Sequence, residues 1–180
     1  MIDKPDFSLS RGAGSKPSRI INLFSAARLA AVQALYQIEF SGSAENAVIE
    51  EFRLHRIGQA DGEVSGGQKV NNFLFQELVN GSSKYREEVD EKITSVLDET
   101  WPLKRLPMVM RCILRLGAFE LIYKLEVPAG VVVKEYVDLA HSFFSGKEPG
   151  MVNGVLDKLA RQLRPGELEA RLERREKTSK

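Results

Sequence analysis

We expect the chain to fold around residues 106 to 125, which read LPMVMRCILRLGAFELIYKL. Only Arg111, Arg115, Glu120 and Lys124 are charged in this segment. At about 100° of rotation per helical residue, the two arginines and the Glu120/Lys124 pair point to roughly opposite sides, with wide apolar faces between them. The uncharged runs are far too short to cross a bilayer, so other helices of the same chain must cover these faces. The pattern predicts a central buried helix with a structural role.

Two small residues inside this segment support a core position. Gly117 costs about 1 kcal/mol relative to alanine in a helix, so we expect a second backbone to pack closely against it. Cys112 is the single cysteine, which excludes an internal disulfide and favours a small core residue over a nucleophile. A lone thiol and the absence of a signal-peptide pattern at the N-terminus predict a cytoplasmic protein without a membrane segment.

Apolar residues spaced three or four apart predict six further helices, near residues 25–40, 44–57, 70–81, 82–101, 128–144 and 151–163. Phe40, Leu54, Phe73 and Phe144 belong to the apolar stripes that we expect to be buried. No segment shows strand alternation with hairpin turns. The sequence therefore predicts an all-α fold of about seven helices, arranged as two small helical-bundle subdomains around residues 106–125.

Composition divides the chain into three parts. Residues 1–24 are rich in Pro, Gly, Ser and basic residues and predict a flexible basic arm. Residues 25–164 form the helical domain, in which the glycine-rich loop 58–68 separates an N-terminal part, 25–57, from a C-terminal part, 69–164. Residues 165–180 are a charged tail with almost nothing to bury.

The chain offers little for catalysis. The loop GQADGEVSGG lacks the flanking strand and the Lys-Ser/Thr pair of a phosphate-binding loop. His55 and His141 are the only histidines, none lies at metal-ligand spacing, and Cys112 has no evident base. We expect no enzyme activity, no cofactor and no metal. The net charge of +1 is uninformative, although residues 1–28 hold five basic and two acidic side chains, which favours binding to phosphates.

Four segments, in order, resemble the NusB family of transcription antitermination factors, especially its alphaproteobacterial members. They are AARLAAVQALYQIEF (26–40), RCILRLGAFELIY (111–123), VPAGVVVKEYVDLAHSFF (127–144) and MVNGVLDKLAR (151–161). The resemblance implies an all-helical fold and no catalysis. It implies that the protein, with the small-subunit ribosomal protein NusE, binds a single-stranded boxA element in nascent RNA and helps RNA polymerase and other antitermination factors to read through ribosomal RNA operons.

The resemblance also implies site residues. In the family's arginine-rich N-terminal segment Arg28 is retained, while Phe24, Ser25 and Ala26 stand where many members have arginine. Met151 takes the place of an RNA-facing aromatic residue. The expected RNA-binding set is Lys16, Arg19, Arg28, Lys147, Met151 and Asn153, and the positions expected to face NusE are Tyr36, Lys104 and Met110.

Two other readings compete with this one. The first is a protein-only adaptor whose basic arm is incidental. The second is the helical domain that begins some ribosomal RNA cytosine methyltransferases, although this chain contains no glycine-rich strand-to-helix turn for a methyl donor. Relatives also dimerise in some cases, and a homodimer would cover the RNA surface.

If Arg28 neutralises an RNA phosphate, the charge reversal Arg28→Glu should weaken boxA binding and flatten its salt dependence without unfolding the protein. A salt titration of RNA affinity measures both effects. Unchanged affinity would count against the assignment.

Overall fold

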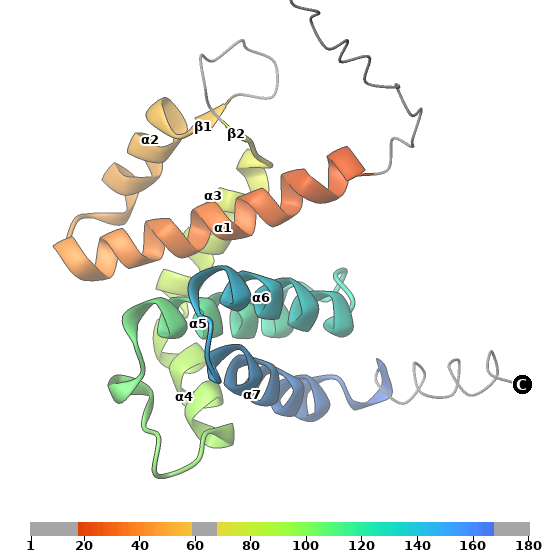
Figure 1. The fold of residues 1–180 in the computed structure, drawn as a ribbon. Coiled ribbons are helices and arrows are strands. Elements are labelled where there is room, and N and C mark those ends of the chain that lie inside the picture. Colours follow the sequence, from red (N-terminus) through yellow and green to blue (C-terminus); the bar gives the residue numbers. More distant parts are fainter. Residues whose placement is uncertain (1–17, 59–67, 168–180) are drawn as a thin grey trace, which may run out of the picture.

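The computed structural model describes residues 18–58 and 68–167, and within these ranges the fold is helical, as predicted (Figure 1). Two strands of two residues pair in parallel, and at that length they leave no sequence pattern. The elements are α1 (Ser18–Ser41), α2 (Glu45–His55), β1 (Ile57–Gly58), β2 (Gln68–Lys69), α3 (Asn72–Lys84), α4 (Arg86–Val96), the 3-10 turn η1 (Leu103–Arg105), α5 (Met108–Tyr123), α6 (Ala129–Phe143) and α7 (Glu148–Leu163).

Helix α5 is the centre of the fold. Helices α1, α3, α4, α6 and α7 all pack against it, and eleven of its sixteen residues are buried. In Figure 1, α1 crosses above α5 and α6, while α7 lies below them. The prediction of a central buried helix is confirmed, and its faces are covered by helices of the same chain.

Close packing explains two helical glycines, Gly117 of α5 and Gly81 of α3. A Cβ on Gly117 would lie 2.9 Å from a methyl carbon of Leu156 and 3.2 Å from the Tyr136 ring. The expected close neighbour is therefore present, but it consists of side chains rather than a second backbone. Gly81 on α3 is tighter, because its Cβ would lie 2.1 Å from the ring of Phe119.

The N-terminal boundary of α1 differs from the prediction. The helix begins at Ser18, so residues 18–24, expected in the arm, are helical. Ser25, a residue type that often caps a helix N-terminus and that stands at the start of the predicted helix, lies inside α1, and its hydroxyl donates a 2.7 Å hydrogen bond to Glu135 of α6. The Ser25 side chain therefore contacts a distant helix and does not cap its own. The C-terminal end is as predicted: Gly42 follows with φ +66°.

Several aromatic and aliphatic residues expected in the core are exposed: Phe40, Leu54 and Phe73. On α6, Phe143 is exposed and the following Phe144 packs against the core. Helical spacing identifies an apolar face but does not show where the covering helix ends. These exposed residues are therefore candidates for contacts with other molecules.

The division of the domain at residues 58–68 stays a prediction, because residues 59–67 lie outside the described part. The arm 1–17 and the tail from residue 168 also lie outside it. Across residues 18–58 and 68–167, no helix has the length and hydropathy needed to cross a membrane.

The glycine contacts give a stability prediction. Gly81→Ala should lower the free energy of unfolding by about 1–3 kcal/mol, because the added methyl meets the Phe119 ring. The matched control is Gly154→Ala in α7, where nothing lies within 4 Å of the new Cβ. That change should raise stability by up to about 1 kcal/mol through helix propensity. Urea unfolding measures both, and stabilisation by Gly81→Ala would contradict the close contact.

Candidate partner-binding groove

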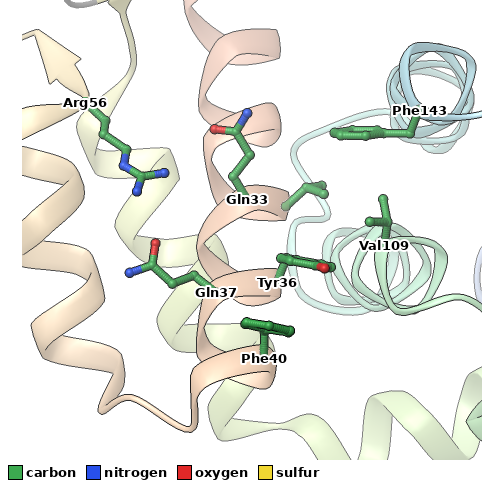
Figure 2. Close-up of a pocket in the computed structure, with 8 residues that line it drawn as sticks. Gln33, Tyr36, Gln37, Phe40, Arg56, Val109 and Phe143 are labelled. Atoms are coloured by element: carbon green, nitrogen blue, oxygen red, sulfur yellow. The ribbon is translucent and has the colours of Figure 1, made fainter.

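A groove of about 440 Å³ opens between α1, the start of α5, the end of α6 and the end of α2 (Figure 2). Tyr36 and Phe40 lie one helical turn apart on α1, and their rings stack with centroids 6.0 Å apart and an interplanar angle of 7°. The groove is lined by Val32, Gln33, Tyr36, Gln37, Phe40, Arg56, Val109 and Phe143.

The aromatic side chains of the groove are unusually accessible. Phe40 is 73% exposed, Phe143 40% and Tyr36 37%. Figure 2 shows Phe143 and Val109 on one side and Arg56, with the α1 glutamines, on the other. Clustered exposed aromatic rings beside polar groups are typical of a protein interface, where burial of the rings supplies the binding energy.

The structure separates the three residues predicted to face a protein partner. Tyr36 lies in the groove, and Lys104 is exposed on η1, just before α5. Met110 is 2% exposed, so the expectation that it contacts a partner is corrected. One residue of helix turns the side chain by about 100°, which takes Met110 into the core while the preceding Val109 reaches the groove.

The predicted RNA-binding residues fall into two groups. Lys147, Met151 and Asn153 lie together at the start of α7, with Lys147 and Asn153 exposed and Met151 half-buried against the core. Lys16 lies outside the described residues, and of Arg19 only the backbone, within α1, is described. Lys147 and Met151 are one helical turn apart, whereas Asn153 is turned by about 200° from Met151 and lines a depression with residues of α6.

Arg28 is enclosed instead of facing solvent. It is 4% exposed, and its Nε and Nη2 atoms each donate a 2.8 Å hydrogen bond to the carboxylate of Glu120 on α5. Nη1 donates to Glu135 of α6 at 3.2 Å, and the hydroxyl of Tyr136 donates to Glu120 at 2.7 Å. A bidentate arginine–carboxylate pair of this kind is a strong, charge-assisted interaction. Arg28 thus joins α1 to α5 and α6.

Electrostatics support this structural role. Burial alone would lower the pKa of Arg28, but hydrogen bonding to Glu120 and its negative charge raise it above its ordinary value. The guanidinium therefore stays charged, and each of its three nitrogens donates a hydrogen bond to a carboxylate. The predictions that Arg28 contacts phosphate and that Arg28→Glu leaves the fold intact are therefore corrected, because a glutamate at this position would face the buried Glu120 carboxylate. The partner carboxylate lies 92 residues away in sequence, and no local pattern reveals it.

Cys112 is fully buried, and burial raises the pKa of its thiol to about 12. A thiol with this pKa is protonated near neutral pH and is a poor nucleophile. Among the described residues, no three His, Cys, Asp or Glu side chains are arranged to hold a metal ion.

Comparison with known proteins decides the family. The profile of the NusB family matches residues 25–161. The chain belongs to the NusB family. The transcription antitermination protein NusB of Maricaulis maris is 46% identical over 142 residues, covering 79% of this chain and 88% of that protein. The same protein from Bradyrhizobium sp. strain BTAi1 is 43% identical over 160 residues, covering 88% and 93%.

Solved structures of the NusB family share the fold. NusB of T. maritima matches with a TM-score of 0.66 at 26% identity, covering 81% of this chain and 96% of that one. A chain from the crystal structure of antitermination factors NusB and NusE in complex with dsRNA matches with a TM-score of 0.64 at 27% identity, covering 77% and 96%. The resemblance found in the sequence is confirmed.

The buried ion pair leads to a prediction for this NusB-family chain. Arg28→Met should lower the free energy of unfolding by about 3–5 kcal/mol, because it leaves the Glu120 carboxylate buried without its cation. The double variant Arg28→Met/Glu120→Gln should recover much of this loss, since the amide is neutral and still accepts from Tyr136. Denaturant unfolding of the three proteins measures the difference. A single variant as stable as the wild type would refute the structural role.

Proposed function

We propose that this chain is a transcription antitermination factor that binds boxA-type single-stranded RNA together with NusE and supports read-through of ribosomal RNA operons. Membership of the NusB family carries the proposal, because the match runs through every helix from α1 to α7. A related chain occurs in a structure with NusE and RNA, which supports both partners.

The α1 groove is the proposed NusE site. Its floor is the stacked Tyr36/Phe40 pair, and its edge includes Phe143 from α6. Burial of these rings by a partner side chain would remove apolar surface from water, at about 25 cal/mol per Å². Lys104 lies just before the segment that brings Val109 to the groove, so it would meet the border of the same partner.

The start of α7 is the proposed RNA surface. Lys147 would neutralise a phosphate, and Asn153 and Met151 would contact bases. Lys16 and Arg19 would add phosphate contacts from the N-terminal segment. Few phosphates are involved, so affinity for RNA alone should be low. NusE bound to the same RNA adds contacts and raises the effective concentration, so the heterodimer should bind more tightly than either protein.

This mechanism uses binding surfaces and no chemical step. The protein would act in the cytoplasm, next to RNA polymerase, as a platform that brings a transcript and a ribosomal protein together. It would stabilise the assembly and would not transform a substrate.

The groove assignment predicts the effect of removing its rings. Tyr36→Ala and Phe40→Ala should each weaken NusE binding by tenfold or more, about 1.4 kcal/mol, as for an aromatic anchor at an interface. Phe73→Ala is the matched control, because this ring is 76% exposed on α3 and does not line the groove. Isothermal titration calorimetry with NusE measures the affinities.

Fluorescence anisotropy with labelled boxA and scrambled RNA, with and without NusE, tests the whole proposal. We expect selective binding to boxA that NusE strengthens. NusE binding with no RNA shift would favour a protein-only adaptor. Equal binding of both RNAs that NusE leaves unchanged would contradict antitermination and favour a general RNA-binding domain of the methyltransferase type.

A further inference from the structure

We propose that Arg56 makes the α1 groove selective for a protein segment in which an apolar side chain lies next to a carboxylate. This inference rests on the proposed function, in that it takes the groove to be the site of a protein partner. It adds the chemistry by which the groove recognises that partner and the residue that performs the selection.

The core of the protein holds Arg56 in place. It is the C-cap residue of α2, and its backbone N–H donates a 2.9 Å hydrogen bond to the carbonyl of Phe52. Its guanidinium carbon lies 4.6 Å from the centre of the Phe52 ring, which is buried and stacks on Phe75 with a centroid separation of 5.6 Å. A guanidinium over an aromatic face gains cation–π attraction, so the buried Phe52 ring restrains the position of the Arg56 head group.

A chain of hydrogen bonds ties the same guanidinium to the groove. Arg56 donates from Nη2 to Glu51 at 3.0 Å, and the other oxygen of Glu51 accepts a 2.7 Å bond from the side-chain amide of Gln37 on α1. The hydrogen bond from Gln37, with further help from Arg56, lowers the pKa of Glu51, so this carboxylate stays ionised near neutral pH. Gln37 lines the groove as well, so the chain connects α2 to the groove wall.

This arrangement prepares Arg56 to bind a second carboxylate. The bond to Glu51 engages one of its three nitrogens, and the side chain is half exposed. Arginine recognises carboxylates through a planar fork, and a fork that is already oriented loses little rotamer freedom on binding. Opposite Arg56, Val109 and Phe143 offer an apolar wall (Figure 2). The groove thus pairs a cation on one edge with an apolar surface on the other.

The same features favour a polypeptide over RNA as occupant. Arg56 is the one cation among the eight lining residues, whereas RNA binding requires several phosphate contacts. The apolar walls give a side chain such as Leu, Ile or Phe a place to be buried.

The test compares two arginines of α2. Arg56→Gln should weaken binding of NusE about tenfold, the loss expected for one charge-assisted hydrogen bond, and should reduce the salt dependence of binding. Arg53→Gln is the control, since Arg53 is exposed, pairs with Glu50 and does not line the groove. It should bind within about twofold of the wild type. Titration calorimetry without RNA, at low and high salt, measures both.

The conservative variant separates fork geometry from charge. Arg56→Lys keeps the charge and loses the bidentate fork, so its affinity should lie between wild type and Arg56→Gln. Wild-type affinity in Arg56→Gln, while Tyr36→Ala still weakens NusE binding, would overturn this inference and leave the proposed function intact. A loss seen only when boxA RNA is present would also overturn it, because Arg56 would then serve RNA. Failure of the wild type to bind NusE would refute both.

Discussion

The buried pair of Arg28 and Glu120 is the interaction on which the arrangement of the helices depends. It joins the middle of the long helix α1 to the last turn of α5, with both partners removed from water. Such a pair contributes little net stability because desolvation offsets the attraction, but leaving either charge alone costs several kcal/mol. Its value is therefore in specifying one position of α1, since any shift along α5 would leave a buried charge without its partner.

A second ionic cluster holds the C-terminal end of α1. Glu39 accepts from Arg115 and, at 3.4 Å, from Arg111, and Arg115 also donates to Asp90 of α4. The two clusters differ in charge, because α1 supplies the cation, Arg28, to the first and the anion, Glu39, to the second. The residues of α1 that line the groove lie mostly between these two attachments. The groove is accordingly built on the half of α1 that these two ion-pair clusters hold, which reduces the entropy lost on binding a partner.

The two proposed binding surfaces are neighbours. Phe143 lines the groove, and Lys147 at the start of α7 follows only four residues later, so their backbones lie within about 14 Å of each other. A protein in the groove and an RNA strand on α7 could therefore contact one another as well as this chain. Mutual contact of the two ligands is a direct physical source of the cooperative binding proposed for this NusB-family factor.

The sequence predicted features that arise within a single helix, but it did not predict contacts between segments far apart in the chain. The apolar run around Gly117 correctly indicated a central helix, and the motif MVNGVLDKLAR correctly indicated the family. Arg28 was misassigned because the family resemblance places it in an arginine-rich RNA-binding segment, while its partner carboxylate lies 92 residues further on. The groove itself was only partly foreseen: Tyr36 was identified, but Phe40 was taken for a core residue because helical spacing cannot show where a covering helix stops.

Hydrogen exchange measured by mass spectrometry on the full chain, alone and with NusE or boxA RNA, tests the central claim most directly. Free NusE should protect α1 around residues 33–40, the start of α5 and the end of α6, and RNA should protect the start of α7. Simultaneous addition should protect both surfaces. Protection by NusE confined to other helices, with the groove exchanging as in the free protein, would contradict the account.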